Sequence, residues 1–68
     1  MNNYYIQYYH GAEVLAKEFK EFKNESLAIS YVRSLDDVFV VKNRGSTQVV
    51  FKSKLTNIKI TEREPDRF

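Results

Sequence analysis

A run of aromatic residues near the start of the chain constrains the fold most. Residues 4–9 contain four tyrosines and one isoleucine, a composition that favours an extended strand over a helix. Side chains alternate along a strand, so three of these residues share one face and three the other: Tyr4, Ile6 and Tyr8, then Tyr5, Gln7 and Tyr9. We predict that one face enters the core and that the other stays outside.

The segment 12–23 is compatible with two structures. Its Ala, Glu, Leu and Lys residues favour a helix, and its apolar residues can share one helical stripe. Gly11 permits a tight turn directly after the first strand, however, and an antiparallel neighbour would pair the backbone groups of that strand. We predict a strand, and the helix remains the alternative.

The following segment has the periodicity of a helix from about Glu25 to Leu35. Its apolar residues recur at helical spacing: Leu27, Ala28, Tyr31, Val32 and Leu35. Either Asn24 or Ser26 can accept a hydrogen bond from the first turn. Asp36 and Asp37 end the pattern.

A second hairpin is predicted after the helix. Residues 38–42 and 47–52 are rich in β-branched and aromatic side chains, and residues 43–46 between them are typical of a turn. On the returning strand, alternation predicts one face toward the core, with Thr47, Val49, Phe51 and Leu55, and one facing out, with Gln48, Val50, Lys52 and Lys54. Residues 58–61 suit a short further strand.

Together these elements predict a small α+β domain in the order β-β-α-β-β, with a short fifth strand. We expect an antiparallel sheet of two hairpins with the helix on one face. The domain covers residues 1–62, and residues 63–68 form a frayed, charged tail. One helix cannot cover both sheet faces, so the other face must meet solvent or a partner.

Composition excludes several classes of protein. The 68 residues include no cysteine, which removes disulfides, cysteine-ligated zinc and thiolate chemistry, and which fits a reducing compartment. No apolar run approaches the roughly 20 residues of a membrane span, and the first residues lack the pattern of a signal peptide. We therefore expect a cytoplasmic protein with no membrane partner.

Charge is distributed unevenly along the chain. Residues 12–37 carry six acids and four bases, whereas residues 38–61 carry five bases and no acid. The second hairpin is thus predicted to be a positively charged element that attracts phosphate or an acidic protein surface.

Signals for catalysis and metal binding are absent from the sequence patterns. His10 near Glu13 is the one conceivable acid–base pair, and a single histidine in a turn is usually a solvated side chain. The glutamates at 18, 21 and 25 interleave with lysines, which is typical of a solvated face, and no calcium loop is present. We expect no enzyme activity, no cofactor, no metal and no small-molecule substrate.

The remaining hypothesis is a small binding module of an accessory, regulatory or inhibitor type. An uncovered sheet face, a surplus of tyrosine and a thin core favour a protein partner or a homodimer. The predicted partner-binding residues are Tyr5, Tyr9, Lys42, Arg44, Lys52 and Lys54. Single-stranded nucleic acid, bound by the basic hairpin and the tyrosine face, is the alternative partner.

Overall fold

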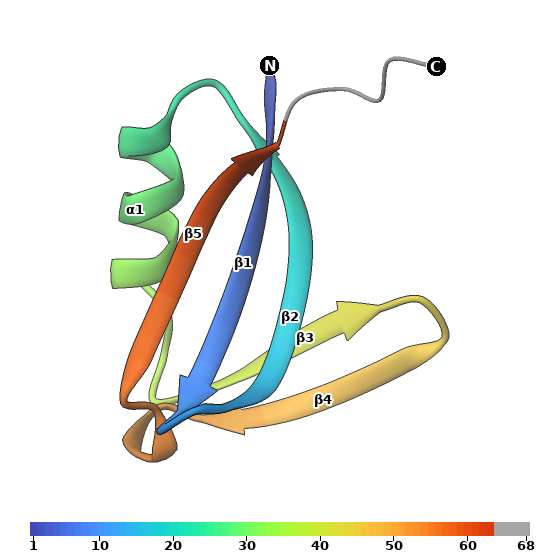
Figure 1. Ribbon diagram of the computed structural model, residues 1–68, viewed down its shortest axis with the longest axis vertical. Helices are drawn as coiled ribbons and strands as arrows, with labels where there is room; N and C mark the ends of the chain where they lie inside the picture. The colour runs from blue at the N-terminus through green and yellow to red at the C-terminus, as the bar shows by residue number, and fades with distance from the viewer. Residues whose placement is uncertain (64–68) are drawn as a thin grey trace.

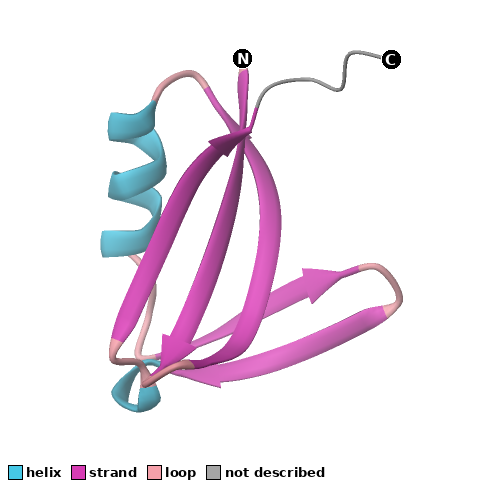
Figure 2. Cartoon of the chain, in the orientation of Figure 1, coloured by secondary structure: helices cyan, strands magenta, loops and turns pink. Residues whose placement is uncertain are grey.

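The computed structural model describes residues 1–63 and confirms a small α+β domain (Figures 1 and 2). The elements follow in the order β1 (Asn2–His10), β2 (Glu13–Phe22), α1 (Glu25–Arg33), β3 (Val38–Asn43), β4 (Ser46–Phe51), a 3₁₀ turn η1 (Lys52–Lys54) and β5 (Asn57–Arg63). The segment 12–23, for which both a strand and a helix were considered, is therefore a strand. The short fifth strand predicted over residues 58–61 is present and longer than predicted. Residues 64–68, most of the predicted tail, lie outside the described residues, and Arg63 is the last residue of β5.

The central element is a three-stranded antiparallel sheet in the order β2-β1-β5. The predicted alternation along β1 is confirmed, because Tyr4, Ile6 and Tyr8 are buried while Tyr5, Gln7 and Tyr9 are half-buried. The pairing of β1 with β2 shifts register after Tyr8, which leaves Leu15 as an extra residue in a β-bulge.

Helix α1 and the β3–β4 hairpin both pack on the face of the sheet that carries the buried tyrosines. The Tyr31 ring of α1 lies 5.4 Å from the ring of Phe22, and the Phe39 ring of β3 lies 5.2 Å from that of Tyr8. In Figure 1, α1 runs beside β5 along one edge of the sheet. The hairpin starts at the lower end of the sheet and projects beyond β2 at the opposite edge. The opposite face of the sheet is left without a second layer among the described residues, as the sequence analysis predicted.

The β3–β4 hairpin forms a separate two-stranded sheet instead of extending the first. Its predicted inward and outward faces are reversed along β4, whereas Leu55, beyond that strand, packs against the core as predicted. Val50 is 5% exposed, whereas Val49 and Phe51 are 58% and 54% exposed. The prediction was wrong because it relied on alternation alone, and both faces of this hairpin carry apolar residues.

Helix α1 begins where the sequence indicated. The Asn24 side chain accepts a hydrogen bond from the Leu27 N–H at 3.0 Å, so Asn24 and not Ser26 is the cap. Neither α1 nor the 3₁₀ turn in the described part of the chain has the length and apolar character that crossing a membrane requires.

Candidate functional site

The uncovered side of the three-stranded sheet, here called the outer face, is the first candidate surface. Strand register places these residues on it: Asn3, Tyr5, Gln7 and Tyr9 of β1, Val14, Lys17, Phe19 and Glu21 of β2, and Asn57, Lys59, Thr61 and Arg63 of β5. The predicted partner-binding tyrosines, Tyr5 and Tyr9, therefore share this face. Both are half-buried by their neighbours and are not isolated rings in solvent.

Two aromatic rings on the outer face form an exposed platform. Tyr5 and Phe19 are direct cross-strand neighbours, and their rings stack with centroids 4.6 Å apart and planes 15° from parallel. Phe19 is 52% exposed, so its ring meets solvent at the edge strand of the sheet. The Arg63 guanidinium lies over the Phe19 ring at 5.4 Å from its centroid, close enough for a cation–π interaction.

Basic residues lie beside these rings in a regular order. Lys17, Gln7 and Lys59 face one another across the three strands, one row along from Tyr5 and Phe19. Tyr9 begins the next row. The sole carboxylate among the residues assigned to the outer face is that of Glu21, at the end of the sheet where Arg63 also lies.

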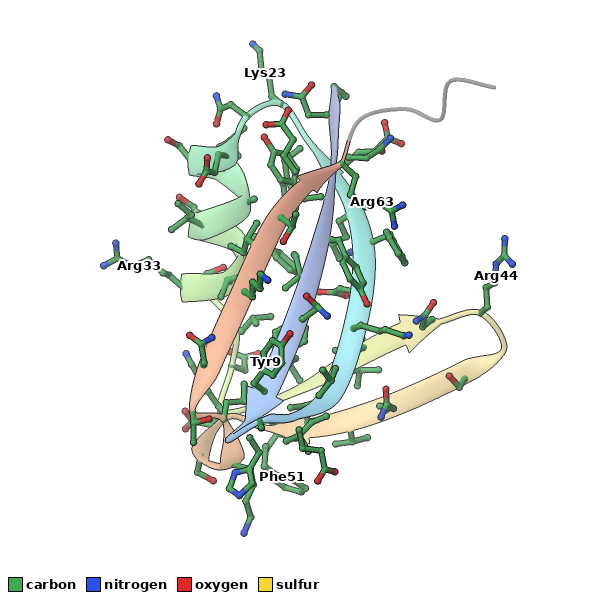
Figure 3. The ribbon with its side chains drawn as sticks, in the orientation of Figure 1. Tyr9, Lys23, Arg33, Arg44, Phe51 and Arg63 are labelled. Atoms are coloured by element: carbon green, nitrogen blue, oxygen red, sulfur yellow. The ribbon has the colours of Figure 1, made fainter. Side chains whose placement is uncertain are left out.

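The four predicted basic residues of the second hairpin do not form one patch. Lys42 and Arg44 lie at its tip, whereas Lys52 and Lys54 lie in the 3₁₀ turn that follows its other end. The side chain of Lys52 donates to the Leu35 carbonyl oxygen at 3.0 Å, which turns it toward the end of α1. Figure 3 shows Arg44 at the projecting tip.

A shallow groove joins the hairpin tip to the edge of the outer face. Its lining residues come from β2 and from the tip: Lys17, Phe19, Lys42, Asn43, Arg44 and Ser46. Lys17 and Phe19 were not predicted as site residues, because the sequence gives no signal that the tip reaches strand β2. The structure thus brings Lys42 and Arg44 beside the β2 edge of the outer face and leaves Lys52 and Lys54 away from it.

The second candidate surface is the exposed side of the β3–β4 hairpin, here called the hairpin apolar face. It carries two cross-strand pairs, Val38 with Phe51 and Val40 with Val49. These four side chains are 47% to 58% exposed. Toward the tip the same face ends with Lys42 opposite Thr47.

A buried carboxylate lies inside the domain and corrects a further prediction. Glu18, expected on a solvated face, is 4% exposed. Its Oε1 accepts hydrogen bonds from the hydroxyls of Tyr8 at 2.7 Å and of Tyr31 at 2.9 Å. Burial raises the pKa of Tyr8 well above its ordinary value, and the bond to Glu18 raises it further. Burial, then the bond to Glu18, raises the pKa of Tyr31 to about 12.

The two tyrosines make stability sensitive to alkaline pH. Above about pH 10 the unfolded chain releases their protons while the folded chain retains them, so the unfolded state binds fewer protons and stability falls as pH rises. Their contribution is complete below about pH 10 and is lost as pH rises toward and beyond the folded pKa of Tyr31, about 12. Urea titrations from about pH 8 to about pH 12 should show a shallower decline for Tyr31→Phe than for the unchanged chain. Equal slopes would contradict this account.

Other reactive groups have structural partners. The Nδ1 atom of His10 lies 2.6 Å from the Lys54 carbonyl oxygen, and the Gly11 N–H donates to Thr56 Oγ1 at 2.7 Å. These contacts tie the β1–β2 turn to the segment before β5. Within residues 1–63, no cluster of three or more His, Asp or Glu side chains is arranged to hold a metal ion.

Comparisons with protein families, with curated proteins and with solved structures found no significant match to this chain. Function is therefore inferred from the outer face and the hairpin apolar face.

Proposed function

We propose that this protein is a non-catalytic binding module that self-associates, with a second copy docking on the hairpin apolar face. The observation that supports the proposal is that the outward face of the hairpin exposes four large apolar side chains, whereas the inward face buries three, beside the exposed amide of Gln48. The proposal retains the accessory role and the cytoplasmic location expected from the sequence.

The pairing of β3 with β4 defines what each face contains. The exposed face presents the four apolar side chains of its two cross-strand pairs. The inner face pairs Phe39 with Val50 and Val41 with Gln48, so it includes an amide. The Gln48 Nε2 donates to the Leu15 carbonyl oxygen, in the bulge of β2, at 2.8 Å. This bond favours the observed orientation of the hairpin, in which the more apolar face is exposed to solvent. A contiguous exposed apolar patch is typical of an interaction surface.

Charges at the two ends of the hairpin apolar face are complementary to each other. Lys42 lies at the tip end. Asp37 lies at the other end, where it lines a surface hollow together with Val38, Phe51 and Lys52, and the Lys52 ammonium group is held by the Leu35 carbonyl oxygen. A two-fold axis that sets two hairpins antiparallel would bring Lys42 of each copy near Asp37 of the other. Such a self-complementary arrangement is typical of symmetric dimers.

The expected affinity is modest. Covering the exposed half of each of these side chains contributes about 1 kcal/mol, and a symmetric pair covers eight of them for a total of about 8 kcal/mol. This gain is similar in size to the roughly 4–15 kcal/mol that association costs. We therefore expect a dimer that forms only as protein concentration rises.

Sedimentation velocity or light scattering from about 1 µM to about 1 mM protein tests the proposal. The unchanged chain should show a concentration-dependent dimer, and Val49→Lys should remain monomeric because it places two charges in the covered surface. The matched control is Val14→Lys, which makes the same change at an exposed valine of β2 and should still dimerise.

Exchanging the end charges provides a second, more specific test. Lys42→Asp and Asp37→Lys should each weaken the dimer, and the double variant should recover most of the loss. A chain that stays monomeric throughout the range, or a dimer unaffected by Val49→Lys, contradicts the proposal. A different protein captured through the same residues, without self-association, also contradicts it.

A further inference from the structure

We propose that the outer face binds single-stranded nucleic acid, with bases stacking on its aromatic rings and phosphates meeting its lysines. The outer face is part of the three-stranded sheet, whereas the proposed dimer uses the β3–β4 hairpin. The two proposals share only Lys42 at the hairpin tip, so Val49→Lys tests the dimer, and substitutions at Lys17, Phe19 and Lys59 test nucleic-acid binding separately.

The stacking surface is already assembled. Tyr5 and Phe19 stack on each other with their rings 15° from parallel, and Phe19 keeps half of its surface exposed. The guanidinium of Arg63 adds a third planar group at the same place. Unpaired bases stack on aromatic rings and on arginine planes whatever their sequence, so this cluster suits one or two bases.

A second ring lies at a spacing that a nucleic-acid strand can follow. Tyr9 is four residues after Tyr5 on β1, a separation of about 13 Å along the strand. Lys17 and Lys59 flank Gln7 in the row between these tyrosines. Bases over the two aromatic positions would thus place the intervening backbone phosphates above two ammonium groups.

The groove at the edge of β2 extends this positive surface. It starts at Lys17 and Phe19 and continues to Lys42 and Arg44 at the hairpin tip. The surface as a whole carries five bases, three on the outer face and two at the tip, and within the residues assigned to it one acid, Glu21. Basic grooves lined with aromatic rings are characteristic of proteins that bind single strands.

These features favour single strands over the other anionic partners. A duplex keeps its bases paired and stacked, and would leave the exposed rings unused. Helix α1 offers only Arg33 in its last turn as a basic residue and lies on the opposite side of the sheet. The basic residues would also attract an acidic protein surface. Such a partner gives no role, however, to parallel rings that alternate with lysines.

Fluorescence anisotropy with labelled oligothymidylate and oligouridylate of about 12 nucleotides tests the inference, with a duplex of equal length as competitor. We expect binding at about 50 mM salt that weakens as salt increases. If all five bases meet phosphates, the slope of log K against log salt approaches about −3.5, at about −0.7 per phosphate. The duplex should compete less well than the single strand.

Two variants separate stacking from charge. Phe19→Ala should weaken binding about tenfold and leave the salt slope unchanged, because it removes a stacking surface and no charge. Lys17→Glu with Lys59→Glu should reduce the magnitude of the slope by about 1.4, since two phosphate contacts are lost. The matched control is Lys23→Glu with Arg33→Glu, which makes the same change in net charge beside α1 (Figure 3) and should bind almost normally.

Circular dichroism establishes that each variant is folded before its affinity is compared, and the lysine pair provides the test if Phe19→Ala does not fold. The inference is overturned by any one of three results. These are the absence of an anisotropy change at low salt, duplex binding as tight as single-strand binding, and equal loss of affinity in the control and the Lys17/Lys59 variants.

Discussion

Replacing Glu18 with alanine is expected to unfold much of the population of this protein. The Tyr8 and Tyr31 hydroxyls both donate to the one buried carboxylate oxygen. Each hydroxyl left without an acceptor costs about 1–3 kcal/mol, so we expect a total loss of about 2–6 kcal/mol. A core in a chain this short rarely provides more than about 3–5 kcal/mol of stability.

Urea denaturation followed by circular dichroism measures this loss. Glu18→Gln should lose less, because it keeps a carbonyl oxygen where Tyr8 and Tyr31 donate. Glu21→Ala, at an exposed glutamate of the same strand, is the matched control and should change stability by less than about 0.5 kcal/mol. If Glu18→Ala is as stable as Glu21→Ala, the hydrogen-bonded carboxylate does not have the role assigned to it.

The second large effect is expected at the contact between the hairpin and the three-stranded sheet. Phe39 is 7% exposed, and its ring lies 5.2 Å from that of Tyr8. Phe39→Ala removes this ring from the core cluster and should cost about 3–5 kcal/mol. The hairpin would then be held by Val41, Val50 and the Gln48 bond, so we expect the groove beside β2 to be lost together with stability.

A phenylalanine on the opposite face of the same hairpin provides the control. Phe51 is 54% exposed, and Phe51→Ala should change the free energy of unfolding far less than Phe39→Ala when both are measured on dilute protein, where any dimer dissociates. Comparable losses from the two substitutions would mean that the hairpin apolar face is packed in the monomer, and would also remove the argument for a dimer.

The first hairpin and the helix could be predicted because local signals identify the first strand, the turn after it and the helix cap. The alternation of Tyr4, Ile6 and Tyr8 is unambiguous, and Gly11, with a φ of 60°, adopts the left-handed backbone that a tight turn needs. That turn outweighs the helical propensity of the residues after it. The Asn24 cap likewise fixes the start of α1.

The orientation of the second hairpin could not be predicted, because alternation yields two faces that are both apolar. Which face packs inward depends on contacts between residues distant in sequence, namely between Phe39 and Tyr8 and between Gln48 and the Leu15 carbonyl. Counting the residues around the Arg44-Gly45 turn would have identified the pairs, although not which face packs inward.

Burial of Glu18 also lacked a local signal. Its neighbours Lys17 and Lys20 are typical of a solvated face, and the hydroxyls that make its burial possible come from Tyr8 and Tyr31, which lie 10 and 13 residues away. The same difference between local and distant signals applies to the candidate sites. The shared face of Tyr5 and Tyr9 follows from one strand, whereas the participation of Lys17 and Phe19 depends on where the tip of the second hairpin lies.

The position of β1 in the middle of its sheet has a consequence for the route to the native state. One edge of β1 pairs with the next strand through a short turn, but the other edge pairs with β5, and the partners Asn3 and Arg63 are separated by nearly the whole chain. Closing so long a loop is slow relative to forming a local hairpin. We therefore expect the β1–β2 hairpin to form early and the docking of β5 to be the rate-limiting event, with the tyrosine-rich strand open to wrong partners until it occurs.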